Sequence, residues 1–117
     1  MGKPHEKLEA CAVSMQLSKS IYELTTTFPA DERFGLTQQM RRVAVSIPSN
    51  IAEGAGRNGA KEHLHFIGIS RGSLAELETQ LQLATMLNYM KSDHQAFELA
   101  DRVGRLLTGL HKKLSMG

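Results

Sequence analysis

The sequence predicts an all-α protein that folds as an up-and-down antiparallel four-helix bundle, with one domain spanning residues 1–117. Apolar residues recur at spacings of three and four through four segments, and no segment alternates like a half-buried strand. Only 5% of the residues are aromatic and Trp is absent, which is typical of helices that pack through aliphatic side chains. The breaks are short, so successive helices should be antiparallel neighbours. The expected helices are residues 5–27, 37–54, 59–90 and 93–115.

The first helix, expected at residues 5–27, carries two stripes that predict two buried flanks. One stripe contains Leu8, Cys11, Met15, Ser18 and Tyr22, and the other contains Ala10, Ser14, Leu17, Ile21, Leu24 and Phe28. Cys11 is the only cysteine, so an intrachain disulfide is excluded, and we interpret it as a small core residue rather than as a reactive thiol. Pro29 ends the segment because proline disfavours helix at the preceding residue.

The second helix, expected at residues 37–54, has one apolar face. This face contains Leu36, Met40, Val43, Ala44, Ile47 and Ile51. Pro48 lacks a backbone N–H, so it should either kink the helix or mark the start of a new one. The clearest break in the chain follows, at the glycine-rich stretch 54–59.

The third helix, expected at residues 59–90, also carries two series. We assign the first series to the bundle core, with Ile67, Ser70, Leu74, Leu77, Leu81, Ala84 and Asn88. The second series is apolar at both ends and polar between them, which favours a contact between subunits. This candidate oligomer interface contains Phe66, Ile69, Ser73, Glu76, Gln80, Leu83, Leu87 and Met90.

The fourth helix, expected at residues 93–115, follows a sequence of the capping-box type at residues 92–95. Its buried series contains Ala96, Leu99, Val103, Leu106 and Leu110, and the face is widened by Ala100, Leu107 and Leu114. The basic residues near its C-terminal end are explained by the helix dipole alone.

Two short patterns resemble binding motifs without their structural context. Residues 54–59 match the G-x-G-x-x-G spacing of dinucleotide-binding proteins, but that motif needs a preceding strand, and here a helix precedes it. Glu62 and His65 form one Glu-x-x-His pair, whereas di-iron bundles require two. No triad of catalytic residues can be recognised. We therefore expect that the protein is not an enzyme and has neither a cofactor nor a metal site.

The net charge of +2 is only mildly basic, so a monomer should not bind nucleic acid strongly by charge alone. An oligomer would repeat any basic patch. The candidate nucleic-acid-binding residues are Arg41, Arg42, Arg57, Lys61 and Arg71. Around the glycine-rich loop, Arg42 is expected level with residues near Arg71, which would form a line of phosphate-binding groups. The alternative is solvated arginines and ion pairs between subunits, because no aromatic residue is expected among them.

Four stretches of the chain together resemble a known family. They are Phe28-Pro29, ERFGLTQQMRR at 32–42, SIPSNIAEG at 46–54, and RGSLAELETQL at 71–81. The resemblance is to the bacterial four-helix-bundle family of 23S rRNA intervening-sequence proteins, and it extends from about Leu8 to Tyr89. Many members of that family have a Trp in the first helix where this chain has Cys11.

The resemblance implies a small protein without assigned catalysis. The family that it resembles is related to accessory proteins of diversity-generating retroelements. Those accessory proteins form pentameric barrels and are thought to bind nucleic acid and a reverse transcriptase. By resemblance, then, we expect a homo-oligomer, a pentamer, with RNA or DNA as candidate partners.

The functional hypothesis is a non-catalytic oligomeric bundle that binds nucleic acid through basic residues without reading its sequence. The alternative is a scaffold for protein–protein interaction with no nucleic-acid role. The N-terminal sequence MGKPHEKLE lacks the apolar segment of a signal peptide, and no stretch resembles a membrane span. We therefore expect a cytoplasmic protein without a membrane partner.

Overall fold

The computed structural model describes residues 8–116 and confirms the predicted all-α four-helix bundle. A short 3₁₀ turn, η2, lies between the first two helices. The elements are α1 (Glu9–Thr25), η2 (Ala30–Glu32), α2 (Leu36–Ala55), α3 (Ala60–Met86) and α4 (Gln95–Met116).

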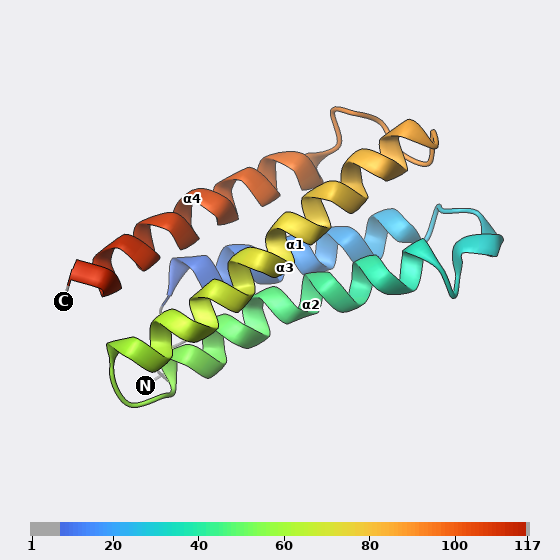
Figure 1. Ribbon diagram of the computed structural model, residues 1–117. Coiled ribbons are helices and arrows are strands. Elements are labelled where there is room, and N and C mark those ends of the chain that lie inside the picture. The colour runs from blue at the N-terminus through green and yellow to red at the C-terminus, as the bar shows by residue number, and fades with distance from the viewer. Residues whose placement is uncertain (1–7, 117) are drawn as a thin grey trace.

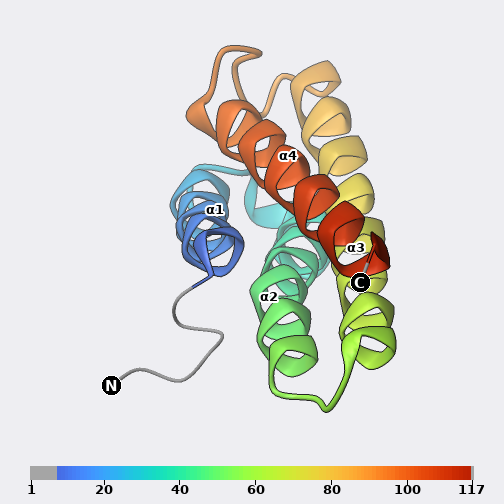
Figure 2. The same ribbon diagram turned by 90° about the vertical axis from the view of Figure 1, so that its left-hand side faces the viewer.

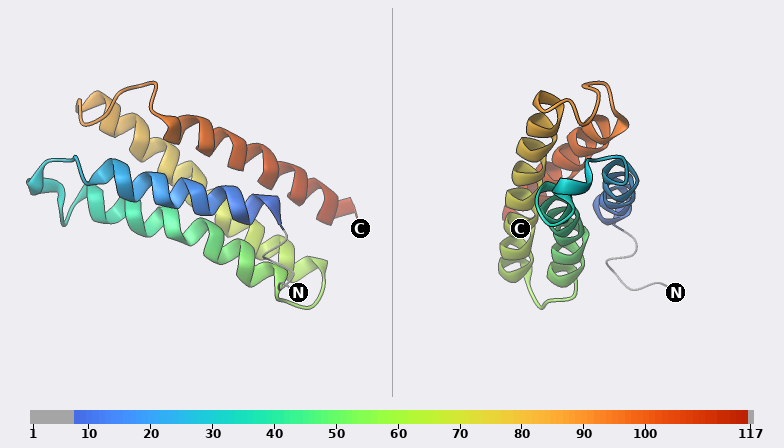
Figure 3. Two further views of the ribbon diagram at one scale, coloured as in Figure 1. Left: turned by 180° about the vertical axis from the view of Figure 1, so that it is seen from behind. Right: turned by 90° about the vertical axis from the view of Figure 1, so that its right-hand side faces the viewer.

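Successive helices run in opposite directions along a bundle that measures 45 × 23 × 22 Å (Figure 1). Each helix packs against two others: α1 contacts α2 and α4, and α3 also contacts α2 and α4. Viewed from the side and from behind, the four helices surround a common interior (Figures 2 and 3). The α1–α2 and α3–α4 connections lie at one end, and the α2–α3 loop lies at the other. None of the described helices is long and apolar enough to cross a membrane.

The core contains most of the residues that the sequence predicts to be buried. On α4, however, Leu99, Leu106 and Leu110 of the predicted buried series are only partly buried, and the buried side chains are Ala96, Ala100, Val103 and Leu107. On α1 the stripe from Ala10 to Phe28 is buried throughout, whereas the other stripe is divided: Cys11 and Ser18 are buried, but Met15 and Tyr22 are exposed. Several core side chains have no exposed surface, namely Leu17, Ile21, Met40, Ile47, Ile51, Ile67, Leu77, Leu81, Val103 and Leu107. The core therefore follows the 3.6-residue period of the helices.

The third helix ends at Met86, four residues before the predicted end at residue 90. Asn88 has a positive φ of 63°, its N–H donates to the carbonyl of Thr85, and the N–H of Tyr89 donates to that of Ala84. These two bonds form a Schellman motif, in which a residue in the left-handed region reverses the chain. The assignment of Asn88 to the core series was therefore wrong, because its side chain is exposed.

The fourth helix begins at Gln95, so the predicted start at residue 93 is two residues early. His94, not Ser92, caps it: the N–H of Ala96 donates to His94 Nδ1 over 3.0 Å. The first helix begins at Glu9 and ends at Thr25, two residues before the predicted end, and residues 5–7 of that prediction lie outside the described part.

Pro48 lies inside a continuous α2, so the helix does not start again there. Proline has no N–H, which deprives the carbonyl of Ala44 of its usual helical donor. Ser18 Oγ of α1 lies 2.9 Å from that carbonyl oxygen and 3.0 Å from the carbonyl oxygen of Ser14, so its one proton is shared between the two acceptors. The carbonyl of Ile47, the residue before Pro48, accepts a hydrogen bond from Ser70 Oγ of α3, also at 2.9 Å. Buried serines of two adjacent helices thus contact α2 around its proline.

The glycine-rich loop connects α2 and α3, as the sequence predicts. Gly54 lies where the two helices approach closely, since a Cβ placed there would be 2.8 Å from Cβ of Phe66 and 3.1 Å from Cδ2 of His63. Gly59, immediately before α3, has a φ of 94°, which favours glycine. The glycines therefore serve helix packing and chain reversal.

Candidate nucleic-acid interface

A basic pocket of about 370 Å³ lies at the end of the bundle where α1 connects to α2. It has no carboxylate in its wall, and its lining residues are Tyr22, Arg33, Phe34, Thr37, Gln38, Arg41 and Arg42. Arg33, Arg41 and Arg42 form no ion pair with any residue among 8–116. This pocket, defined by its seven lining residues, is called the arginine pocket below.

Arg41 is fixed in the pocket wall by contacts with α1. Its Nε donates to Thr25 Oγ1 over 2.8 Å, and Nη2 donates to the carbonyl of Tyr22 over 3.2 Å. The guanidinium also lies over the Tyr22 ring, 4.7 Å from its centroid. A guanidinium has five N–H donors, and these contacts leave the others without an acceptor among residues 8–116.

Phe34 and Arg33 occupy the chain between η2 and α2. The Phe34 side chain is 79% exposed, and the Arg33 guanidinium lies 5.3 Å from its ring centroid. The prediction that no aromatic residue lies among the basic ones was therefore wrong, because Phe34 and Tyr22 both line the pocket. The adjacent residues Arg33 and Phe34 could have indicated an aromatic side chain beside a basic one. The presence of Tyr22 in the pocket could not have been predicted, because it depends on how α1 packs against α2.

The turn that carries these residues is held by Glu32. One carboxylate oxygen accepts the N–H of Leu36 over 3.1 Å, and the other accepts the hydroxyl of Tyr89 over 2.8 Å. These bonds lower the pKa of Glu32 because both stabilise the ionised carboxylate, the backbone bond most. A Cβ on Gly35 would lie 2.7 Å from the Glu32 carboxylate, so glycine there leaves room for the bond. Glu32 thus points toward Tyr89 and not toward the arginines.

Glutamine in place of Glu32 is expected to remove part of the acid dependence of stability. Because the pKa of Glu32 is lowered in the folded state, its ionised form stabilises the fold above the ordinary pKa of a glutamate, and this contribution is lost as pH falls through the lowered value. Urea unfolding at pH 7 and pH 3 would measure this dependence. Equal changes in stability between these pH values for wild type and Glu32→Gln would contradict the prediction.

The other predicted basic residues lie away from the arginine pocket. Arg57 is paired with Glu53 and lies over the Phe66 ring, 5.1 Å from its centroid. Lys61 is exposed near the start of α3, at the α2–α3 loop, and α2 extends roughly 20 Å from Arg42 to its end at Ala55 at the standard helical rise. The structure thus brings Arg41 and Arg42 together with Arg33, and places Arg57 and Lys61 at the opposite end of α2.

Arg71 belongs to neither end. Ser46 Oγ and Ser73 Oγ are hydrogen-bonded at 2.7 Å, which sets the register between α2 and α3. Arg42, one turn before Ser46, is therefore level with residues near Leu77. Arg42 was expected level with residues near Arg71, but this register places it about six residues further along α3, and the exposed Arg71 side chain lies nearer the middle of that helix.

The candidate oligomer interface does not form one uniformly exposed face. Its exposed members are Ile69, Glu76, Leu83 and Leu87. Phe66 and Met90 are half-buried, Ser73 contacts Ser46, and Gln80 is only 7% exposed. The apolar surface available for another subunit is therefore concentrated near the end of α3, where Met86 is also 78% exposed. The interface itself stays a prediction.

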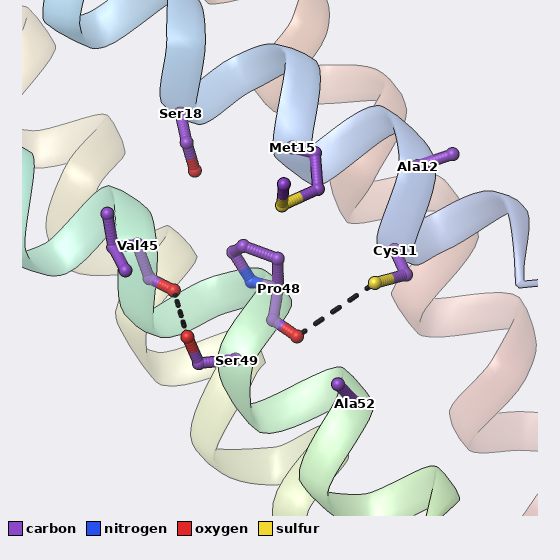
Figure 4. A pocket seen from close by; sticks show the side chains of 8 residues that line it. All are labelled: Cys11, Ala12, Met15, Ser18, Val45, Pro48, Ser49 and Ala52. Atoms are coloured by element: carbon purple, nitrogen blue, oxygen red, sulfur yellow. Dashed lines mark hydrogen bonds between the residues drawn. The ribbon is translucent and has the colours of Figure 1, made fainter. Parts of the chain in front are cut away.

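An apolar groove of about 540 Å³ lies between α1 and α2 (Figure 4). Its walls come from Cys11, Ala12, Met15, Ser18, Val45, Pro48, Ser49 and Ala52. Met15 and Cys11 extend toward Pro48, and Cys11 Sγ lies 4.0 Å from the Pro48 carbonyl oxygen. Cys11 is only 9% exposed, and burial raises the pKa of its thiol, which agrees with its predicted role as a core residue.

The isolated Glu-x-x-His pair lies on the surface, because Glu62 and His65 are both exposed. His63 between them faces α2 at Gly54, and burial lowers its pKa. Within residues 8–116, no three His, Cys, Asp or Glu side chains gather in a way that could hold a metal ion.

The fold and this site define the class of protein: an all-α four-helix bundle with a basic and aromatic pocket at one end and an apolar groove along its side. The sequence profile of the 23S rRNA-intervening sequence protein family matches residues 6–109. The chain therefore belongs to that family. No curated protein shows a significant match to it.

Proposed function

We propose that this protein binds nucleic acid through phosphate contacts at the arginine pocket, without reading base sequence and without catalysis. The observation that carries the proposal is the gathering of Arg33, Arg41 and Arg42 around a pocket whose wall contains no carboxylate. Guanidinium groups fit phosphate oxygens, and three of them in one place form a local positive field even though the net charge is only +2.

The ion pairs of three of the other four arginines support this choice of site, and the fourth, Arg71, lies apart from the pocket near the middle of α3. Arg57, Arg102 and Arg105 each contact a carboxylate, so a phosphate would have to compete with a neighbour already present. The neighbouring carboxylate of Glu32 bonds to the hydroxyl of Tyr89 and not to an arginine. The arginine pocket therefore offers its cations directly to solvent.

A charge-matched pair of double variants tests the proposal. Arg33→Ala/Arg42→Ala removes two unpaired cations at the pocket, whereas Arg102→Ala/Arg105→Ala removes two paired cations from α4. Gel-shift titrations with duplex DNA and with structured RNA, at 50 and 200 mM salt, would measure affinity. We expect the pocket variant to bind at least about 10-fold more weakly and to lower the salt slope for duplex DNA by about 1.8, because two phosphate contacts are lost.

The control variant is expected to retain the wild-type salt slope, and circular dichroism would show that both variants fold. Equal losses in both variants would indicate a general charge effect and would overturn the assignment to this pocket. No binding by the wild type at 50 mM salt would overturn the nucleic-acid function itself.

The alternative is a protein–protein scaffold, favoured by the apolar groove between α1 and α2 and by the exposed end of α3.

The family resemblance supports a homo-oligomer of five copies as part of either proposal. Such a ring would carry five times the +2 charge of one chain, about +10, and would repeat the arginine pocket around its axis. If light scattering at micromolar concentration gave the mass of one chain, the proposed oligomer would be overturned. We place the protein in the cytoplasm.

A further inference from the structure

We propose that the arginine pocket takes an unpaired nucleotide, with its base stacked on Phe34 and its phosphate bound by the neighbouring arginines. The inference rests on the proposed nucleic-acid function and specifies the form of nucleic acid: single-stranded at the point of contact. The geometry that points to it is an aromatic ring, 79% exposed, beside three arginines that have no ion pair among residues 8–116.

Phe34 is the most exposed aromatic side chain among residues 8–116, and it lies outside the helices. It follows η2 and precedes α2, in a turn held by the Glu32 bonds to Leu36 and Tyr89. The exposed phenyl ring contributes little to the core, so its face is available for contact with a ligand. A ring held on a fixed turn can offer a face for stacking without the entropy cost of ordering a mobile segment.

The surroundings of the ring distinguish a nucleotide from a purely apolar partner. The Arg33 guanidinium lies 5.3 Å from the Phe34 ring centroid, and that of Arg41 lies 4.7 Å from the Tyr22 centroid. Aromatic rings interleaved with arginines are the pattern by which proteins bind single strands, since rings stack with bases while guanidinium groups contact the backbone. An apolar peptide would instead have to leave these guanidinium groups dehydrated without a partner.

A base-paired nucleotide cannot use Phe34 as a stacking partner. Inside a duplex, the faces of each base are covered by the bases above and below it, so an external ring cannot stack on them except at the two ends. The arginines can contact duplex phosphates without any contribution from Phe34. The role of Phe34 therefore separates single-stranded from duplex binding, and the two can be tested independently.

The experiment measures binding of labelled 12-nucleotide oligo(U), oligo(dT) and a 12-base-pair duplex by fluorescence anisotropy. Phe34→Ala is expected to weaken binding of the single strands by about 5- to 100-fold, as for the loss of one stacked base, and to change duplex binding by less than about 2-fold. Oligo(U) against oligo(dT) distinguishes RNA from DNA. The matched control is Met116→Ala, which removes an apolar side chain of equal exposure, 79%, from the end of α4.

Phe34→Trp provides a direct optical signal, because the chain contains no other Trp. This variant should keep single-strand binding within about 3-fold of wild type, and its fluorescence should be quenched when a base stacks on the indole. Equal losses of single-strand and duplex binding in Phe34→Ala, or no loss in either, would overturn the inference. Binding of duplex alone by the wild type would overturn it and leave the proposed function standing, whereas no binding of any probe would overturn both.

Discussion

Replacing Ser18 with alanine is expected to lower the free energy of unfolding by about 1–3 kcal/mol, because it leaves the buried carbonyl of Ala44 without a donor. In an ordinary helix this carbonyl would accept the N–H of residue 48, but that residue is Pro48. Ser18 Oγ supplies the missing bond from α1 at 2.9 Å, and it shares its proton with the carbonyl of Ser14 at 3.0 Å. Ser18 is only 8% exposed, so water is poorly placed to replace the hydroxyl.

A double-mutant cycle with Pro48→Ala isolates this interaction. Alanine at position 48 restores the N–H that can bond to Ala44, so Ser18→Ala should cost less in that background, by about 1 kcal/mol. Ser49→Ala is the control, since its hydroxyl is exposed and bonds within α2 to Val45. Urea unfolding followed by circular dichroism would measure all of these variants. The same cost for Ser18→Ala in both backgrounds would show that Ser18 acts otherwise.

Alanine substitutions at two helical glycines are expected to change stability in opposite directions. Gly54→Ala should destabilise the protein by about 1–2 kcal/mol, because its Cβ would lie 2.8 Å from Cβ of Phe66 and would force α2 and α3 apart. Gly72→Ala in α3 should stabilise it by about 0.5–1 kcal/mol, since nothing lies within 4 Å of the added Cβ and alanine favours helix.

Thermal unfolding monitored at 222 nm would rank the two variants against wild type, and the Gly72 variant serves as the control for helix propensity. A gain in stability from both substitutions would mean that α2 and α3 can separate at little cost. In that case the glycine at position 54 would not be required for the close approach of the helices.

The arginine pocket shows where sequence reasoning stopped. Arg41 and Arg42 were predicted as candidate binding residues because they are basic residues on the predicted second helix. Arg33 and Phe34 were missed, since they lie in the break between helices, where periodicity carries no information. Tyr22 belongs to a stripe predicted as buried, yet it is 45% exposed, because α1 buries only its other stripe completely.

The sequence by itself determined the fold class, the number of helices and most of the core, because a period of three and four residues is a local property of the chain. The family was indicated by specific stretches such as SIPSNIAEG at 46–54 rather than by this period. The hydrophobic pattern did not predict where α3 ends and α4 begins. These bounds depend on the backbone conformation of Asn88 and on the bond from the Ala96 N–H to His94 Nδ1. Only the tertiary structure shows that the Arg41 guanidinium contacts the Tyr22 ring and that Ser18 bonds to the carbonyl of Ala44. These contacts join residues of different helices, and their alignment depends on how the helices pack rather than on the pattern within either one.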